Sequence, residues 1–272
     1  MGDIEQNVDI WQDHWDWSDE GDQWSAWWGG TPALWHGALL PRIHAFVPTG
    51  TILEIAPGFG RWTQFLKDLC DRLVIVDLTE RCIEHCRIRF AASSNIEYVV
   101  NDGRTLESVA DASVDFAFSF DSLVHVEADV IESYLAELQR VLTRDGVAFI
   151  HHSNLGAYGR VPRLVRRIPQ RALGPLARRG VVPDVFAWRA ESVTADGVAA
   201  MCDRVGLGCI SQERISWERG RFLIDTLSLV ARRGSRWDRP RVVVDNPGVR
   251  REAYRMAMLW ASTSPPSRSN RP

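Results

Sequence analysis

Imidazole, carboxylate and amide side chains gather at two places in the sequence, each at the end of an apolar run. The run VAFIHHSN ends in His151, His152 and Asn154, and the run VDFAFSFDSLVH carries Asp121 and His125. A neutral imidazole can remove a proton from a hydroxyl group, and a carboxylate can orient that imidazole, so these residue types predict general-base catalysis. Side chains alternate along a strand, so one of the two adjacent histidines should face a ligand and the other should pack.

Each of these side chains also has an alternative role. His125 could instead pack against neighbouring residues or cap a helix, and Asp121 could cap the turn that follows it. Asp121, one imidazole and Asn154 could together bind Mg²⁺. Residue types alone do not decide between these roles.

The elements that would position these residues alternate along the middle of the chain. Short apolar runs predict strands at residues 51–56, 72–78, 96–102, 114–122 and 146–153, and helical patterns predict helices at residues 61–70, 79–90 and 128–142. Strands separated by helices indicate βαβ units and a parallel sheet.

The pattern changes after residue 194. A helix is predicted at residues 194–206, followed by strands at 207–217 and 222–232. The four residues between these strands are too few for a parallel crossover, which needs about a dozen, so the pair must be antiparallel. We therefore predict an α/β fold with a doubly wound, mostly parallel seven-stranded sheet whose last strand is antiparallel.

In an open α/β sheet, ligands bind beyond the carboxyl ends of the strands. The first predicted strand ends in Glu54-Ile-Ala-Pro-Gly-Phe-Gly60, a turn in which Ala56 takes the first glycine position of a nucleotide-binding motif. The second ends in Asp77, a carboxylate that can accept hydrogen bonds from both hydroxyls of a ribose. The third ends in Asp102-Gly103, which could contact an exocyclic amine and leave room for a flat base.

This ordered set resembles the class I S-adenosylmethionine-dependent methyltransferases over roughly residues 50–232. The Glu54–Gly60 turn matches the first motif of that family, and the segment from Gln139 to Gly146 resembles its RVLKPGG-like helix end. The resemblance implies a Rossmann-like fold and S-adenosylmethionine as the cofactor. A nicotinamide enzyme is the main competitor, but the antiparallel last strand and the Asp102-Gly103 turn favour the methyl donor. The implied cofactor-binding residues are Glu54, Ala56, Gly58, Gly60, Asp77, Leu78, Asp102, Gly103 and Phe120.

Composition excludes some other classes. The chain has 272 residues, a net charge of −3 and no apolar run of about 18 residues, so neither a membrane span nor a general nucleic-acid surface is indicated. The first residues lack the basic and apolar regions of a secretory signal, which predicts a cytoplasmic protein. Five cysteines without zinc-ribbon spacing predict buried thiols and no structural metal.

Two segments flank the predicted methyltransferase domain at residues 49–232. Residues 1–48 form an acidic segment, and its first 41 residues hold seven of the twelve tryptophans. Indole faces suit the C–H faces of a sugar ring, so Trp15 and Trp28 are predicted to bind substrate. The alternative is an amphipathic helix packed over the core. Residues 233–272 are predicted to form one helix and a disordered tail.

Within the domain, residues 155–193 form an arginine-rich insertion that we expect to be a lid. Seven arginines and no acidic residue occur between residues 155 and 183. Arginines of this kind bind phosphate, or they pair as a solvated face with the acidic N-terminal segment.

The segments HHSN and DSLVHVE and the tryptophan-rich start are similar to those of actinobacterial sugar O-methyltransferases, in particular the mycobacterial 1-O-methyltransferases of methylmannose polysaccharide synthesis. That resemblance implies methylation of a sugar hydroxyl, such as the reducing-end 1-hydroxyl of a short 3-O-methylated mannoside, with a histidine base. The alternatives are a small-molecule O-methyltransferase acting on a phenol or polyketide glycoside, and a catalytically inactive binding subunit with this fold. The substrate is then a carbohydrate or other small molecule, and the oligomeric state stays open, a homodimer being one alternative.

Overall fold

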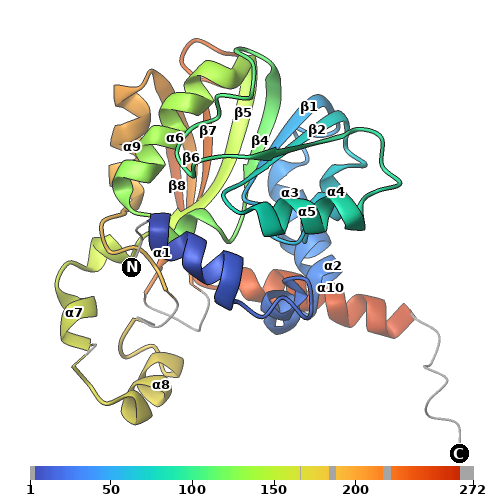
Figure 1. Ribbon diagram of the computed structural model, residues 1–272. Helices are drawn as coiled ribbons and strands as arrows, with labels where there is room; N and C mark the ends of the chain where they lie inside the picture. Colours follow the sequence, from blue (N-terminus) through green and yellow to red (C-terminus); the bar gives the residue numbers. More distant parts are fainter. Residues whose placement is uncertain (1–3, 166, 184–187, 217–221, 264–272) are drawn as a thin grey trace, which may run out of the picture.

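The computed structural model describes residues 4–165, 167–183, 188–216 and 222–263, and its centre is an eight-stranded sheet with helices on both faces (Figure 1). The strand order is β3-β2-β1-β4-β5-β7-β6-β8. The strands are β1 (Thr49–Ile55), β2 (Cys70–Asp77), β3 (Ile96–Val100), β4 (Val114–Ser119), β5 (Leu142–Ser153), β6 (Leu207–Ile215), β7 (Asp225–Arg232) and β8 (Val242–Asn246).

The predicted doubly wound sheet is confirmed. Strands β1 to β5 pair in parallel, and β7 lies antiparallel to both β5 and β6. The carboxyl ends of β1, β2 and β4 therefore meet at one edge, which brings the predicted cofactor turns together.

The number of strands is a correction, because β8 adds an eighth strand parallel to β6. The sequence pattern predicts only a helix and a tail beyond residue 232. The run Val242-Val243-Val244 is short and stands between Pro240 and Pro247, so it lacks the alternation by which a half-buried strand is usually recognised.

Two element boundaries also differ from the prediction. The helix predicted at residues 61–70 shrinks to α4 (Thr63–Leu66), because β2 already begins at Cys70. Strand β5 begins at Leu142, four residues before the predicted start, and absorbs the turn-like segment Thr143–Gly146.

Two apolar layers cover the sheet. On one face, buried residues of α2 (Thr31–Leu34), η3 (Trp35–Leu39), α3 (Leu40–Ile43), α5 (Glu80–Arg89) and α10 (Val249–Thr263) pack against phenylalanines of β4 and β5. On the other face lie α6 (Ala128–Val141) and α9 (Ala195–Arg204). Thr79 and Thr194 begin α5 and α9 with side-chain caps that accept hydrogen bonds from the backbone N–H groups of Cys82 and Gly197.

The N-terminal segment crosses the carboxyl-terminal edge of the sheet (Figure 1). It consists of α1 (Ile4–Val8), η1 (Asp9–His14) and η2 (Asp22–Trp28). The insertion holds η5 (Leu155–Tyr158), α7 (Val161–Val165) and α8 (Gln170–Arg178), and α7 and α8 project away from the sheet (Figure 1). Residues 166 and 184–187 of the predicted lid, and residues 264–272 of the predicted tail, lie outside the described residues.

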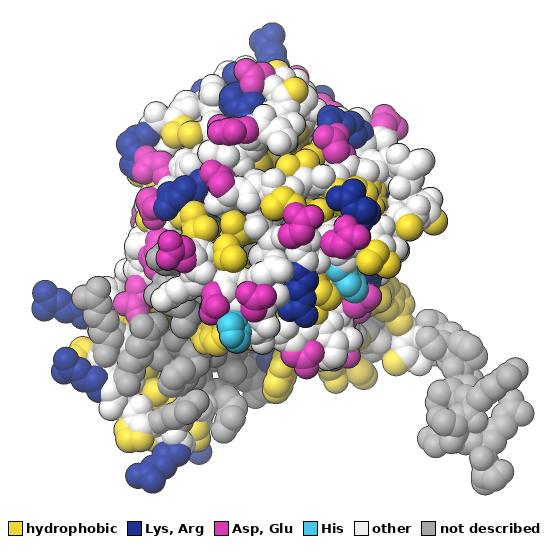
Figure 2. All heavy atoms as spheres, in the orientation of Figure 1, with side chains coloured by type: hydrophobic (Ala, Val, Ile, Leu, Met, Phe, Trp, Pro, Cys, Tyr) yellow, Lys and Arg dark blue, Asp and Glu magenta, His cyan; other side chains and the backbone are white. Residues whose placement is uncertain are grey.

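Over the face seen in Figure 2, acidic and basic side chains are interspersed. Among the described residues, no helix combines the length and apolar character needed to cross a membrane.

Candidate functional site

A pocket lies where the N-terminal segment meets the carboxyl ends of β1, β2 and β4. Its empty volume is about 940 Å³, including the open mouth. The sheet side of the pocket is formed by the glycine-containing turn after β1, by Asp77-Leu78-Thr79 after β2, and by Phe120 to His125 after β4. The opposite side is formed by Trp11, Trp17 and Trp24.

The turn after β1 brings backbone close to the pocket. Ala56, Gly58 and Gly60 all have left-handed backbone conformations, with φ angles of 58°, 58° and 86°. A Cβ atom on Gly60 would lie 2.5 Å from the Phe90 ring, and one on Gly58 would lie 2.9 Å from the Trp17 ring. Both positions therefore require glycine. Ala56 adopts the conformation that a glycine would favour, at a cost of about 1–2 kcal/mol.

Glu54 is buried beneath this turn. Its Oε2 atom accepts a hydrogen bond of 2.6 Å from the Thr63 hydroxyl, and its Oε1 atom is buried without a hydrogen-bond partner among the described residues. Burial raises the pKa of Glu54 to about 8. The carboxyl group is therefore protonated at pH 7, and Glu54 lies beneath the turn without lining the pocket.

Asp77 closes β2 and faces the same turn. Its Oδ2 atom accepts a hydrogen bond of 3.1 Å from the Gly58 N–H, and its Oδ1 atom accepts from the N–H and hydroxyl of Thr79. Burial raises the pKa of Asp77 to about 6 although these hydrogen bonds act to lower it. The carboxylate is thus held at the pocket wall beside Leu78.

The turn after β3 contributes less directly. Gly103 lines the pocket, whereas Asp102 lies in a smaller groove next to it. The Oδ1 atom of Asp102 accepts hydrogen bonds from the backbone N–H groups of Arg104 and Thr105, which outweigh its partial burial and lower its pKa.

The adjacent histidines of β5 point to opposite faces of the sheet, and neither lines the pocket. His152 is fully buried, with Nε2 2.8 Å from the Ser228 hydroxyl and Nδ1 2.9 Å from the Ser153 carbonyl. Burial lowers its pKa to about 4. His152 therefore packs inside the sheet, where it cannot reach a substrate.

His151 is also fully buried, but it lies directly behind the pocket wall. Its ring stacks on Phe120 at 4.5 Å, its Nδ1 atom accepts a hydrogen bond from the Asp121 N–H, and its Nε2 atom lies 3.3 Å from a carboxylate oxygen of Asp225. Both ring nitrogens are occupied by protein groups. The expectation that one histidine of this pair faces the ligand therefore does not hold in this structure.

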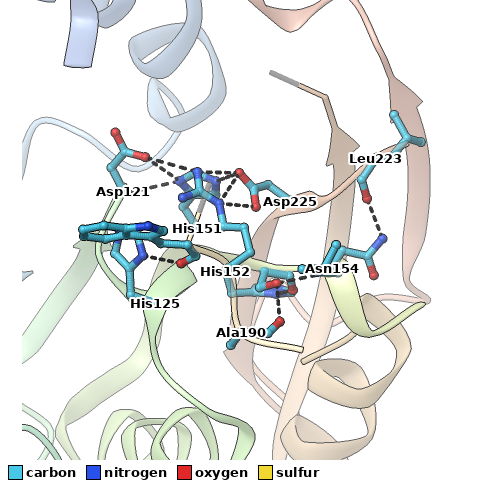
Figure 3. Close-up of polar contacts among 12 residues, drawn as sticks. Asp121, His125, His151, His152, Asn154, Ala190, Leu223 and Asp225 are labelled. Atoms are coloured by element: carbon cyan, nitrogen blue, oxygen red, sulfur yellow. Dashed lines mark hydrogen bonds and ion pairs between the residues drawn. The ribbon is translucent and has the colours of Figure 1, made fainter. Parts of the chain in front are cut away.

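His151 belongs to a network of buried charges (Figure 3). Arg189 contacts both carboxylate oxygens of Asp225 through Nε at 2.8 and 3.0 Å, and Arg61 contacts Oδ2 of Asp121 at 2.8 Å. Burial acts to raise the pKa of Asp121, but its neighbours Arg61, His151 and Arg189 together outweigh burial, and the pKa of Asp121 is lowered. Asp121 lines the pocket in a left-handed conformation with φ 71°, so the network holds a carboxylate at the pocket wall.

His125 is the one imidazole of the predicted set that lines the pocket. Its Nδ1 atom lies 2.6 Å from the backbone carbonyl of Trp188 (Figure 3). A carbonyl only accepts, so Nδ1 carries the proton and Nε2 holds the lone pair. Among the described residues, Nε2 has no hydrogen-bond partner. Burial, and then the charge of Arg189, lower the pKa of His125 to about 4, so the ring is neutral at pH 7.

The three predicted substrate-binding residues have different places. Trp28 is 1% exposed within the main core and does not line the pocket, which corrects that prediction. Trp15 is half-buried and stacks on the pocket-lining Trp24 at 5.5 Å. Asn154 donates to the Leu223 carbonyl and accepts from the Ala195 N–H, so its side chain joins the end of β5 to the start of α9.

These contacts also bear on the magnesium alternative. The amide of Asn154 and the carboxylate of Asp121 are engaged by protein groups. Within the described ranges, no group of three or more His, Cys, Asp or Glu residues is placed to hold a metal ion.

Sequence reasoning missed Arg61, Arg189 and Asp225. Arg61 directly follows the glycine turn, and Asp225 begins the strand paired with β5. Both residues could therefore have been identified from their positions in the sequence. Arg189 had none, because it lies 36 residues from Asp225 in an insertion without a recognisable motif.

Comparison with known proteins agrees with this geometry. A family model described as a methyltransferase domain matches residues 52–146, which run from β1 into β5. No curated protein matches the sequence.

Solved structures with the same fold are distant in sequence. The PH0226 protein from Pyrococcus horikoshii is 23% identical, with a TM-score of 0.52, over 72% of this chain and 88% of that chain. The TehB-like SAM-dependent methyltransferase from Corynebacterium glutamicum is 17% identical, with a TM-score of 0.50, over 85% and 98%. A complex of DhpI with SAH is 19% identical, with a TM-score of 0.52, over 84% and 96%.

Proposed function

We propose that this chain, a class I S-adenosylmethionine-dependent methyltransferase, methylates a hydroxyl group of a sugar, with His125 as the general base. The observation that carries the proposal is a pocket in which the cofactor turns, three indole rings and an imidazole of fixed tautomer meet.

The pocket residues fit the cofactor. Gly58 lines the pocket with a left-handed backbone that a side chain would strain, and Asp77 presents a carboxylate where a ribose would lie. When bound, the cofactor supplies a methyl group on a sulfonium, which an acceptor oxygen can displace.

The opposite end of the pocket suits a sugar. Trp11 and Trp24 line it with apolar rings, and Asp121, whose Oδ2 atom is paired with Arg61, would accept from a hydroxyl group through its other oxygen, Oδ1. Trp11 lies 5.7 Å from the His125 ring, so an acceptor resting against this indole would be next to the base.

His125 would take the acceptor proton at Nε2. Its Nδ1–H bond to the Trp188 carbonyl keeps the lone pair on the other nitrogen, and its lowered pKa keeps the ring neutral at pH 7. The negative charges of Asp121 and Asp225 act to raise the pKa of His125, but burial and the charge of Arg189 outweigh them, so His125 is a weaker base than a free imidazole. Residues of the N-terminal segment form one side of the site.

The proposed substrate is the reducing-end 1-hydroxyl of a short 3-O-methylated mannoside. Support for this choice comes from the resemblance of the HHSN and DSLVHVE segments and the tryptophan-rich start to sugar O-methyltransferases. A phenol is the second candidate, because the same indole faces would stack on an aromatic ring.

The test is methyl transfer from labelled S-adenosylmethionine to a panel of methylated and unmethylated manno-oligosaccharides, phenols and glycosides. We expect label in the mannosides, and its position on the product identifies the hydroxyl. Transfer to phenols alone would replace the sugar proposal with the second candidate. Cofactor binding by calorimetry without transfer to any acceptor would favour an inactive binding subunit.

A further inference from the structure

Strand β8 forms one edge of the sheet and exposes three consecutive valines. Val242, Val243 and Val244 are 50%, 41% and 50% exposed, and in the described part of the chain no strand pairs with the outer side of β8. An edge strand with free backbone groups and apolar side chains can pair with another strand unless charges, proline or a bulge prevent it. Within β8 none of these features interrupts the valine run.

Two prolines limit the length of the segment that can pair with another strand. Pro240 and Pro247 stand on either side of residues 241–246. A proline cannot donate a ladder hydrogen bond, so pairing must begin and end inside these limits. The middle of the valine run is Val243.

The strand carries opposite charges near its two ends, so two copies in antiparallel orientation would bring unlike charges together. Arg241 and Asp245 lie two residues on either side of Val243, and their side chains point to the same face as that of Val243. In an antiparallel pair of two identical strands centred on Val243, Arg241 of each strand faces Asp245 of the other. Val242 then faces Val244.

The side chains at these ends are accessible. The Arg241 and Asp245 side chains are 32% and 51% exposed, and each is fixed within the chain by one ion pair, to Asp196 at 2.9 Å and to Arg214 at 2.6 Å. These contacts hold both charges at the sheet edge, where a second strand would meet them.

We propose that β8 is an interaction surface for a second copy of this chain, which joins two sheets through an antiparallel β8–β8 pair with two-fold symmetry. Two-fold symmetry repeats the Arg241–Asp245 and Val242–Val244 contacts on both sides of the axis, and Val243 faces its own copy at the axis. This pairing places valine opposite valine and arginine opposite aspartate. Pairs of both kinds are favourable between adjacent strands of a sheet.

Sedimentation equilibrium of the full chain over a range of concentrations tests this pairing. We expect a dimer with twice the mass of the 30.8 kDa chain. Val243→Lys, which places two ammonium groups opposite each other at the axis, should remove the dimer. Val100→Lys is the matched control, because Val100 is 42% exposed on the other edge strand, β3, and should leave the dimer intact.

A charge exchange separates pairing between chains from ion pairs within a chain. Asp245→Arg places a guanidinium group opposite Arg241 of the second copy, so two like charges meet and the dimer should be abolished. The double variant Arg241→Asp with Asp245→Arg restores both pairs between chains while the pairs to Asp196 and Arg214 stay broken, so the dimer should return. Circular dichroism checks that each variant is folded.

Three results would overturn the proposal. A wild-type chain that is monomeric at every concentration would show that β8 does not pair with a second copy. A dimer that survives Val243→Lys would place the interface elsewhere, as on the exposed face of α10. A double variant as monomeric as Asp245→Arg alone would contradict the antiparallel register.

Discussion

The backbone carbonyl of Trp188 lies 2.6 Å from Nδ1 of His125, so a residue 63 positions further along the chain fixes the tautomer of the pocket imidazole. Trp188 has a φ angle of 53°, and Arg189, which follows it, is anchored to the buried carboxylate of Asp225. Residues near the end of the insertion at 155–193 thus fix the tautomer of the His125 ring in the pocket.

Replacing His125 tests its role as the base. His125→Ala should lower kcat by about 10²–10⁴-fold, the usual contribution of a positioned base, while the cofactor dissociation constant stays unchanged by calorimetry. His44→Ala, an exposed histidine outside the pocket, is the control. Equal kcat values for wild type and His125→Ala would remove His125 from the mechanism.

The pH dependence of the wild type gives a second measure of this base. A base acts when it is neutral, and the pKa of His125 is about 4, so activity should rise through about pH 4 and stay level between pH 6 and 8. An activity that instead rises through pH 6.5 would indicate an imidazole without this environment.

Arg189→Ala should destabilise the fold and reduce turnover together. Breaking one side of a buried ion pair leaves Asp225 uncompensated, which costs about 3–5 kcal/mol of unfolding free energy in urea titrations. The Trp188 carbonyl should lose its position, so kcat should fall even at temperatures where the variant is folded. Arg189→Lys should recover part of both effects, and stability loss with full kcat would contradict the positioning role.

Arg189→Ala should also change how stability depends on pH in the acid range, because of Asp225. The pKa of Asp225 in the folded chain is below its unfolded value of about 3.9, so its contribution to stability is present above that value and is lost as the pH falls through the folded pKa. Without Arg189 the folded pKa should rise, and the stability profile between pH 2 and 5 should become flatter.

Glu54→Gln should change the pH dependence of stability in the opposite sense. The folded pKa of Glu54 is about 8, above its ordinary value of 4.5, so the folded chain binds the extra proton and loses stability as the pH rises between these values. The variant should remove this slope, on the order of a few kcal/mol across the range. The exposed Glu107→Gln is the control. A slope unchanged by Glu54→Gln would show that Asp77, whose pKa is also raised, causes it alone.

Trp17→Ala tests the cover of the cofactor turn. Trp17 stacks on Phe59 with ring centroids 4.4 Å apart and is 7% exposed, so its loss should cost about 3–5 kcal/mol of stability. The lost stack should also raise the cofactor dissociation constant by up to roughly tenfold in calorimetry. Trp27→Ala removes a tryptophan that is 73% exposed and should change neither quantity. Equal cofactor affinity for both variants would separate Trp17 from the pocket.

The sequence predicted the doubly wound sheet and the cofactor turns because both depend on local patterns. The glycine turn, Asp77 and Gly103 each follow directly from a strand end, and all three line the pocket. β8 escaped prediction because three exposed valines between prolines show no alternation.

The acceptor side of the pocket could be predicted only in part. Strand alternation shows that the side chains of His151 and His152 point to opposite faces. It does not show that Asp121 and Asp225 contact the ring nitrogens of His151. Those contacts depend on the pairing of β5 with β7 and on the return of Arg189 to the sheet, which join residues far apart in the chain. Trp28 and Trp17 look alike in the sequence, and only packing places one in the core and the other at the turn.

The N-terminal segment is fastened to the cofactor side of the pocket by Gln12, which accepts a hydrogen bond from Arg81, and by Glu20, which contacts His85 and Arg89. Because Glu20 also lines the pocket, these contacts hold part of its wall beside the cofactor turns, and a ligand bound there would lie between the segment and the sheet. If the segment must move for the cofactor to exchange, we expect the methylated acceptor to leave first and cofactor exchange to limit turnover. Product inhibition by S-adenosylhomocysteine that competes with S-adenosylmethionine, together with a burst in the first turnover, is the kinetic behaviour this arrangement implies.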